Sequence, residues 1–201
     1  MAFARIEGEI PGQGYQVSVH EGFPFCITAD VFRSLHLSVG QNLTEAEYLE
    51  LKEVQARRNC RSQAMVYLAR REHTGLELTQ KLTQKGYETG IIRTTLDQLA
   101  EENLLSEYRY ALLTIEQRQR KSPEGRILMA QRLAAKGVNR EDANRALDEL
   151  YHEEAIVEYV QRAYTQAEQK VGADKVRMQL QKKGFSSYEI RLGLEGFEKS
   201  E

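Results

Sequence analysis

The chain has 201 residues, and its 28 lysines and arginines against 30 acidic residues give a formal net charge of −2. This near-balance argues against strong nucleic-acid binding through bulk charge, because affinity for phosphates grows with the number of aligned cations. No apolar run approaches bilayer-spanning length and no cleavable signal pattern opens the chain, so we expect a cytoplasmic protein that does not enter membranes.

The first sixty residues predict a small β-hairpin followed by a helix. Residues 15–19 and 23–27 alternate apolar with polar side chains around a Glu21-Gly22 turn, and Pro24 favours an edge position for the second strand. Thr44 with Glu47 has the spacing of a capping box, which predicts a helix running to about residue 57.

A six-residue phrase then recurs three times, at residues 82–87, 133–138 and 180–185. Each copy contains a Lys-Gly pair and ends on an apolar or aromatic residue, and the glycines are Gly86, Gly137 and Gly184. Apolar residues also keep a common register before and after each glycine. Such a period is typical of stacked helical units that bury their apolar faces against their neighbours.

The fold class that follows is mainly all-α, with tandem three-helix repeats in an elongated, curved array behind the N-terminal hairpin. We expect four segments, at residues 1–58, 59–104, 105–152 and 153–201, of which the last three are the repeats. Apolar periodicity places their helices near 61–72, 74–84, 89–101, 106–120, 123–136, 140–151, 153–168, 173–183 and 187–198.

Each repeat glycine fits the left-handed position just after a helix, where the preceding lysine meets the negative end of the helix dipole. Alanine at any of the three should therefore lower stability by roughly 1 kcal/mol. The neighbouring helices carry their own start signals: Thr74 with Glu77, Ser122 with Pro123, Asn139 with Asp142, Ser186 with Glu189, and the less helpful Gly172.

Catalysis and cofactor binding find no support in the residue pattern. His20, His36, His73 and His152 are isolated from nucleophile motifs, and Cys26 and Cys60 lack neighbours at metal-binding spacing. We expect His73 to be a surface turn residue and both cysteines to be reduced. The sequence thus predicts no enzyme, no cofactor and no metal site.

Basic residues gather around one turn of the second repeat. Arg118, Arg120, Lys121 and Arg126 flank it, and Lys85, Lys136 and Lys183 mark the three repeat turns. Arg57, Arg58, Arg61, Arg70 and Arg71 form another stretch. One interpretation is a solvated helix face; the other is a contact surface for an acidic protein or a nucleic acid, with side chains that packing does not need.

These residues carry a resemblance to the RecX family of bacterial regulators of the RecA recombinase. The matching segments are AMVYLARR at 64–71, TGLEL at 74–78, KLTQKGY at 81–87, ENLL at 102–105 and YRYA at 108–111. Gly125, twelve residues before Gly137, and LSVG at 37–40 also fit. Ser106-Glu107 and Arg132 depart from the family pattern, which prefers acidic residues there.

The resemblance implies a monomeric, non-enzymatic regulator in homologous recombination, DNA repair and the SOS response. Such a protein would bind the RecA nucleoprotein filament and inhibit its extension, ATP hydrolysis and strand exchange, with room for weak contact to single- or double-stranded DNA. Two alternatives stay open: a helical-repeat protein that binds DNA directly, and an adaptor for another protein.

Overall fold

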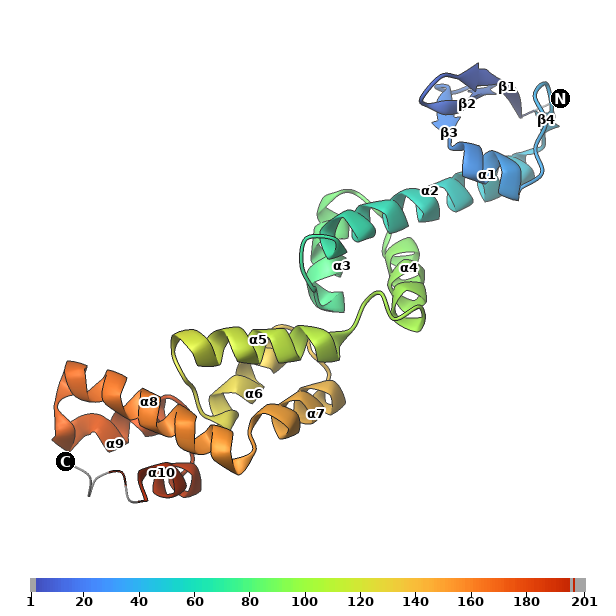
Figure 1. The fold of residues 1–201 in the computed structure, drawn as a ribbon. Helices are drawn as coiled ribbons and strands as arrows, with labels where there is room; N and C mark the ends of the chain where they lie inside the picture. The colour runs from blue at the N-terminus through green and yellow to red at the C-terminus, as the bar shows by residue number, and fades with distance from the viewer. Residues whose placement is uncertain (1–2, 196, 198–201) are drawn as a thin grey trace. The chain divides into compact units, whose positions relative to one another are not determined.

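The computed structural model describes residues 3–195 and 197, which form ten helices and one small sheet (Figure 1). The chain falls into two compact units. The first contains the residues up to Ala69 together with Thr79–Glu101, and the second contains Arg70–Leu78 and the residues from Glu102 onward. Within the described residues, no helix has both the length and the apolar character needed to cross a bilayer.

The sheet of the first unit confirms the predicted hairpin and extends it. Strands β2 (Gly14–Val19) and β3 (Phe25–Ile27) pair antiparallel, and β3 is the edge strand that follows Pro24. Two further strands that the sequence did not predict, β1 (Ala4–Ile10) and β4 (Asn42–Leu43), complete the order β3-β2-β1-β4. A register shift interrupts β1, and β4 has only two residues, so neither presents a clear alternating pattern.

One face of the sheet packs on α1 (Ala29–Ser34) and on the start of α2 (Glu45–Leu68). This small core contains seven buried residues: Ala4, Ile6, Val17, Ile27, Val31, Leu43 and Leu51. The side-chain oxygen of Gln55 accepts a hydrogen bond of 2.9 Å from the backbone N–H of Thr28, which ties α2 to the end of β3. Packing on α2 supplies the support that a short sheet lacks alone.

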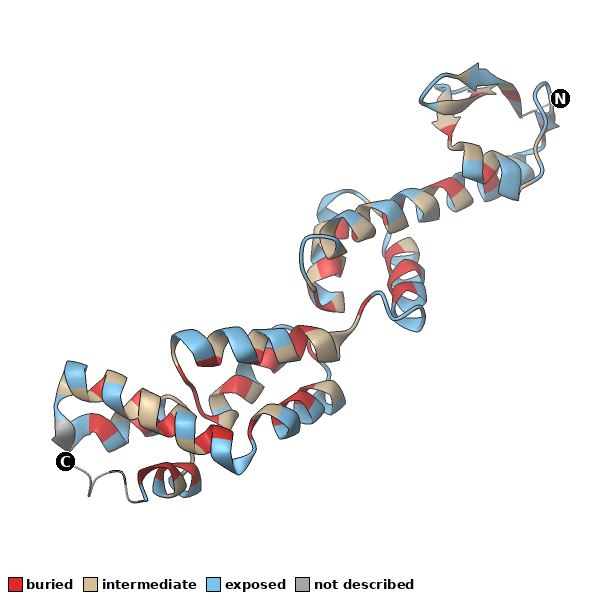
Figure 2. Cartoon of the chain, viewed as in Figure 1, coloured by how far each residue is buried: buried red, intermediate tan, exposed pale blue. Residues whose placement is uncertain are grey.

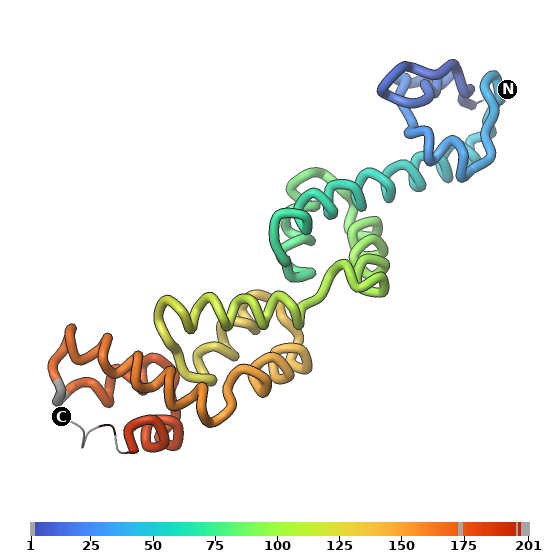
Figure 3. The backbone as a smooth tube through the Cα atoms, in the orientation of Figure 1, coloured from blue at the N-terminus to red at the C-terminus, as the bar shows by residue number. Residues whose placement is uncertain are grey.

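The predicted break between helices near residues 57 and 61 is wrong, because α2 is one continuous helix of 24 residues (Figure 3). No glycine or proline interrupts it, and Cys60 and Ala64 continue its buried face. Thr44 and Glu47 do form the predicted capping box. Helix α4 (Thr89–Glu101) packs on α2, and burial there raises the pKa of the Cys60 thiol. Both cysteines are free, as expected.

The second unit contains six complete helices that cover one shared core. They are α5 (Glu107–Lys121), α6 (Arg126–Ala135), α7 (Arg140–Leu150), α8 (Glu153–Val171), α9 (Ala173–Lys182) and α10 (Ser187–Leu194). Figure 2 shows buried residues recurring along one side of these helices, the pattern that the apolar periodicity predicts. Their bounds agree with the predicted ones to within a few residues, and residues 196 and 198 of the last predicted helix lie outside the described part.

Helix α3 (Gly75–Gln84) begins in the second unit, and the predicted glycine turn follows it. Gly86, Gly137 and Gly184 have φ angles of 85°, 81° and 82°, which confirms the left-handed prediction for all three. Ser106, Asn139 and Ser186 cap α5, α7 and α10 through their side chains. The repeated phrase therefore builds the same helix end three times.

Candidate partner-binding surface

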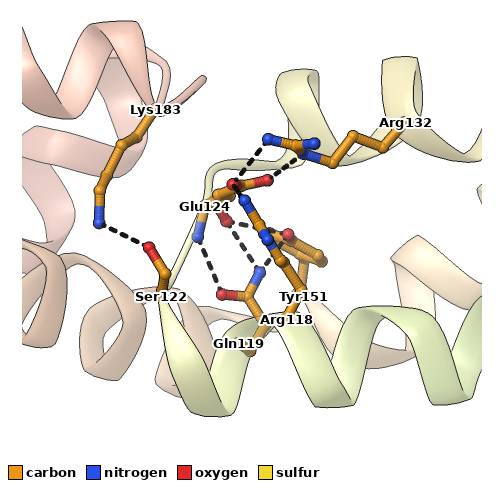
Figure 4. Close-up of polar contacts among 7 residues, drawn as sticks. All are labelled: Arg118, Gln119, Ser122, Glu124, Arg132, Tyr151 and Lys183. Carbon is orange, nitrogen blue, oxygen red and sulfur yellow. Dashed lines mark hydrogen bonds and ion pairs between the residues drawn. The ribbon is translucent and has the colours of Figure 1, made fainter.

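The connection between α5 and α6 is organised around a buried carboxylate. The Glu124 side chain is only 4% exposed. Arg118 donates to its Oε1 from Nε and Nη2 at 2.8 and 2.6 Å, and Arg132 donates to Oε2 from Nε at 2.6 Å and to Oε1 from Nη2 at 3.0 Å (Figure 4). Two half-exposed arginines therefore satisfy one buried charge, as burial requires.

The backbone of Glu124 is held as firmly as its side chain. Gln119 accepts from its N–H at 3.1 Å and donates to its carbonyl at 2.8 Å, while the Tyr151 hydroxyl donates to the same carbonyl at 2.9 Å. Burial raises the pKa of Tyr151, so the hydroxyl stays protonated as a donor. These bonds keep residues 122–125 out of the helix.

For that reason, the prediction that Ser122 and Pro123 begin a helix is wrong. Ser122 is the C-cap residue of α5. Helix α6 begins after Gly125, which provides no side-chain cap. Thr74 does cap α3, because its hydroxyl accepts from the Glu77 N–H at 3.1 Å. Gly172 precedes α9 and likewise supplies no side-chain cap.

The four cations around this turn do not share one environment. Arg118 holds Glu124, and Arg126 Nη2 lies 2.6 Å from Asp148 Oδ1. The expectation that packing needs none of the four is therefore wrong for Arg118, whose partner is buried, whereas the partner of Arg126 is a largely exposed carboxylate. Arg120 and Lys121 have exposed side chains, which leaves them as the more accessible charges of the cluster.

The lysines of the second and third repeat turns take part in two joints between repeats. The first joint consists of Thr74, Leu76 and Glu77 against Lys136 and Gly137: the Thr74 hydroxyl donates to the Lys136 carbonyl at 2.8 Å. The second joint consists of Gly125 and Leu128 against Lys183 and Gly184: the Gly125 N–H donates to the Lys183 carbonyl at 2.9 Å. Lys85, in the first unit, is exposed.

The lysine side chains also close these joints. Lys136 Nζ lies 3.3 Å from Glu77 Oε1, and Lys183 Nζ donates to Ser122 Oγ at 3.3 Å. Burial is the main cause that lowers the pKa of Lys183, and Lys170 adds to the effect. Both lysines therefore have a structural task, and Lys136 remains partly accessible as well.

Two cations and one histidine ring contact the Glu77 carboxylate. Its Oε2 lies 2.9 Å from Arg71 Nη1 and 3.1 Å from His73 Nδ1, while Lys136 approaches Oε1. Burial alone would raise the pKa of Glu77, but Arg71, Lys136 and His73 together hold it below its ordinary value. His73 is 3% exposed, so the prediction of a surface turn residue is wrong. Its ring contacts the carboxylate of Glu77, four positions further along the chain.

An open hollow of ≈ 380 Å³ lies between α5 and α6, and four cations line it: Arg118, Lys121, Arg132 and Lys136. A second hollow of ≈ 310 Å³ shares Tyr110 and Lys136 with it and adds Arg71, Glu72 and Glu77. In the second hollow, the charges of Glu72 and Glu77 balance those of its two cations. The surplus positive charge therefore lies in the first hollow, where Arg118 and Arg132 share the single charge of Glu124. We define the lining of both hollows as the cationic groove.

Part of this groove is predicted by the sequence, which singles out Arg118, Lys121 and Lys136 and places Arg71 in a second basic stretch. Arg132 stands out there only as a departure from the family pattern. Arg132 is eight positions after Glu124, more than two helical turns away, and no pairing rule for a single helix connects them. Across the described residues, no three histidine, cysteine or acidic side chains gather as a metal site.

Comparison with known proteins gives a consistent result. Residues 60–99 match the family described as RecX, first three-helix domain. A regulatory protein RecX of Halorhodospira halophila is 35% identical over 140 residues, which are 65% of this chain and 83% of that protein. A regulatory protein RecX of Pseudomonas fluorescens is 46% identical over 89 residues, which are 44% of this chain and 57% of that protein.

Two solved structures share the fold. A crystal structure of regulatory protein RecX has a TM-score of 0.77 at 19% identity and covers 92% of this chain and 98% of its own. A crystal structure of RecX from Lactobacillus salivarius has a TM-score of 0.60 at 20% identity, and the match covers 72% of this chain and 98% of that protein's chain. At these identities the likeness concerns the arrangement of helices and strands.

Proposed function

Because the chain belongs to the RecX family of regulatory proteins, we propose that it binds the nucleoprotein filament of a RecA-type recombinase and inhibits filament extension, ATP hydrolysis and strand exchange. In this proposal the protein acts by binding, without a reaction of its own. The cationic groove is the observation that supports a particular binding surface for the filament.

The groove suits a filament made of protein and nucleic acid. Arg118, Arg132 and Lys136 are held in place by Glu124 and Glu77, so an acidic partner would meet cations whose positions are fixed before binding. Preorganised charges lose less conformational entropy on binding than free side chains do. A repeat protein can also make several weak contacts at once, and such contacts reinforce one another on a filament.

The decisive experiment is a titration of this protein into the cognate recombinase on single-stranded DNA, with ATP hydrolysis as the signal. We expect hydrolysis to fall as the protein is added, and the inhibition to weaken as salt rises, because exposed charges are screened within about 10 Å at 0.1 M salt. A flat response at saturating protein would overturn the proposal.

Charge reversal locates the contact. Lys121→Glu reverses an exposed cation that lines the groove, and Arg120→Glu reverses its exposed neighbour in the last turn of α5. Neither change touches the pairs to Glu124 or Asp148. We expect weaker inhibition at unchanged melting temperature. Arg93→Glu with Lys175→Glu, on α4 and α9, is the matched control with the same change in net charge. Equal inhibition by both double variants would move the contact away from this turn.

The same groove leaves direct DNA binding as the second candidate function. Its cations would contact phosphates without reading sequence. Affinity for a labelled single strand or duplex, measured without recombinase over a range of salt, separates the two functions. Tight, salt-dependent binding that the recombinase does not enhance would favour a DNA-binding protein.

A further inference from the structure

The Lys-Gly turn is built identically in all three repeats. In the first, Gly86 N–H donates to the Thr83 carbonyl at 2.9 Å and Tyr87 N–H donates to the Leu82 carbonyl at 3.2 Å. The turns at Gly137 and Gly184 repeat these two bonds at 2.9 and 3.1 Å. This is the Schellman arrangement that closes a helix on a left-handed residue. All three turns therefore present the same backbone shape.

Two of the three turns are seated on another helix. In the first joint, a Cβ placed on Gly137 would lie 2.6 Å from the Cβ of Leu76; in the second, a Cβ placed on Gly184 would lie 2.4 Å from the Cβ of Leu128. Leu76 and Leu128 belong to the first turns of α3 and α6. Each seated turn thus covers the beginning of the middle helix of the preceding repeat.

The turn of the first repeat has the same shape and no such neighbour. A Cβ placed on Gly86 would meet no heavy atom within 4 Å, and Lys85 is exposed. No repeat precedes it, because the sheet and α1 occupy that part of the sequence. Of the three turns in the described part of the chain, this one presents an open docking face.

Electrostatics specifies what this face accepts. The end of a helix presents carbonyl oxygens with partial negative charge, and the beginning of a helix presents N–H groups with partial positive charge. The two joints show this pairing directly, since a donor on the residue just before one helix meets the carbonyl of Lys136 or Lys183. In the first joint, Lys136 also pairs with Glu77, the third residue of α3.

We propose that the turn at Lys85 and Gly86 docks onto the beginning of a helix in the recombinase that this regulator controls. The inference rests on the proposed function and adds the contact that carries it. By analogy with the two joints, the complementary helix has a threonine or glycine just before its first turn and a leucine within that turn. By analogy with the first joint, a carboxylate on that helix pairs with Lys85. The leucine occupies the space in front of Gly86.

The test fills that space without disturbing the turn. In Gly86→Asn, asparagine accepts a positive φ better than other side chains do, so the helix end is retained while the docking face is blocked. Gly12→Asn is the matched control, because Gly12 also has a positive φ of 75° and open space around it. Lys85→Glu tests the charge separately.

Inhibition of recombinase ATP hydrolysis and co-sedimentation with filaments are the readouts, with thermal melting as the check on folding. We expect both Gly86→Asn and Gly12→Asn to melt close to the unaltered protein. Gly86→Asn should require at least about tenfold more protein for half-inhibition, a weakening of one decade in affinity. Lys85→Glu should weaken inhibition most at low salt.

Each contrary result has a distinct meaning. If the unaltered protein has no effect on the recombinase, the proposed function fails and this docking fails with it. If the unaltered protein inhibits and Gly86→Asn inhibits equally well, the docking alone is wrong. If analytical ultracentrifugation finds self-association that Gly86→Asn abolishes, the occupant is a second copy of this chain, and the proposal for the recombinase is overturned.

Discussion

The two joints occupy the same register in the repeat and are closed by different means. At the first, Thr74 contributes a side-chain hydroxyl, and Glu77 with Lys136 forms an ion pair near the surface. At the second, the equivalent position is Gly125, whose backbone contacts the next repeat directly. The carboxylate nearest to this position in the sequence belongs to Glu124, which is buried just before α6. The same position in the repeat can therefore join two repeats either through a side chain or through the backbone.

This difference shows that two joints with the same place in the repeat need not contribute equally to the free energy of unfolding. A joint closed by partly exposed side chains has room to adjust when one of them changes. A joint in which two backbones touch has no such room, because backbone atoms cannot rotate away. The following variants, from the largest expected effect to the smallest, measure this difference.

The largest loss of stability should come from removing both partners of Glu124. Arg118→Gln with Arg132→Gln leaves a buried carboxylate without a cation, and breaking a buried pair in this way typically lowers stability by about 3–5 kcal/mol. Arg120→Gln with Lys121→Gln is the matched control on exposed neighbours and should melt normally. Urea denaturation that places both double variants within about 1 kcal/mol of each other would show that Glu124 does not anchor the connection between α5 and α6.

Gly125→Ala tests backbone closure without a φ penalty, since Gly125 has a φ of −71°. A Cβ there would lie 2.1 Å from the carbonyl oxygen of Gly184 and 2.2 Å from Phe185 N, so the joint must open. We expect a loss of about 3 kcal/mol, at the upper end for overpacking. Gly90→Ala has nothing within 4 Å and serves as the control. Similar melting of the two variants would contradict backbone closure.

Alanine at the three turn glycines should lower stability by different amounts, whereas the sequence alone predicts equal losses. Gly86→Ala meets only the left-handed penalty, about 1–2 kcal/mol. Gly137→Ala adds a clash with the Leu76 side chain, and Gly184→Ala adds one with the Leu128 backbone nitrogen at 2.6 Å. Gly184→Ala should therefore lose the most, about 3 kcal/mol or more. Chemical denaturation ranks the series, and equal losses would mean that neither joint restricts its glycine.

The smallest effect concerns acid sensitivity at the first joint. The pKa of Glu77 is lowered in the folded protein, so its stabilising contribution is present above its ordinary pKa of 4.5 and is lost as pH falls through the folded value. Glu77→Gln should therefore lose less stability than the unaltered protein between pH 7 and about pH 3. Glu141→Gln, which changes an exposed residue of α7, is the control. Identical pH profiles for all three proteins would remove this role from Glu77.

Local features of this protein were readable from its sequence. The capping box at Thr44, the side-chain caps at Asn139 and Ser186, and the left-handed turn at Gly86 depend on residues within about six positions of each other. Such interactions form from neighbouring residues alone, so their spacing predicts them. The mainly helical class followed from the same periodicity.

The tertiary structure decided which of these similar features matter. The assignment of Arg132 to Glu124 depends on how α6 packs beside the connection that precedes it, and only the folded chain shows that His73 is buried. Joint contacts connect residues about sixty positions apart, such as Thr74 with Lys136, and have no local signature. Sequence alone therefore determined three equivalent turns, and packing made two of them joints while leaving the turn at Gly86 open, because only the later repeats have a preceding repeat to cover.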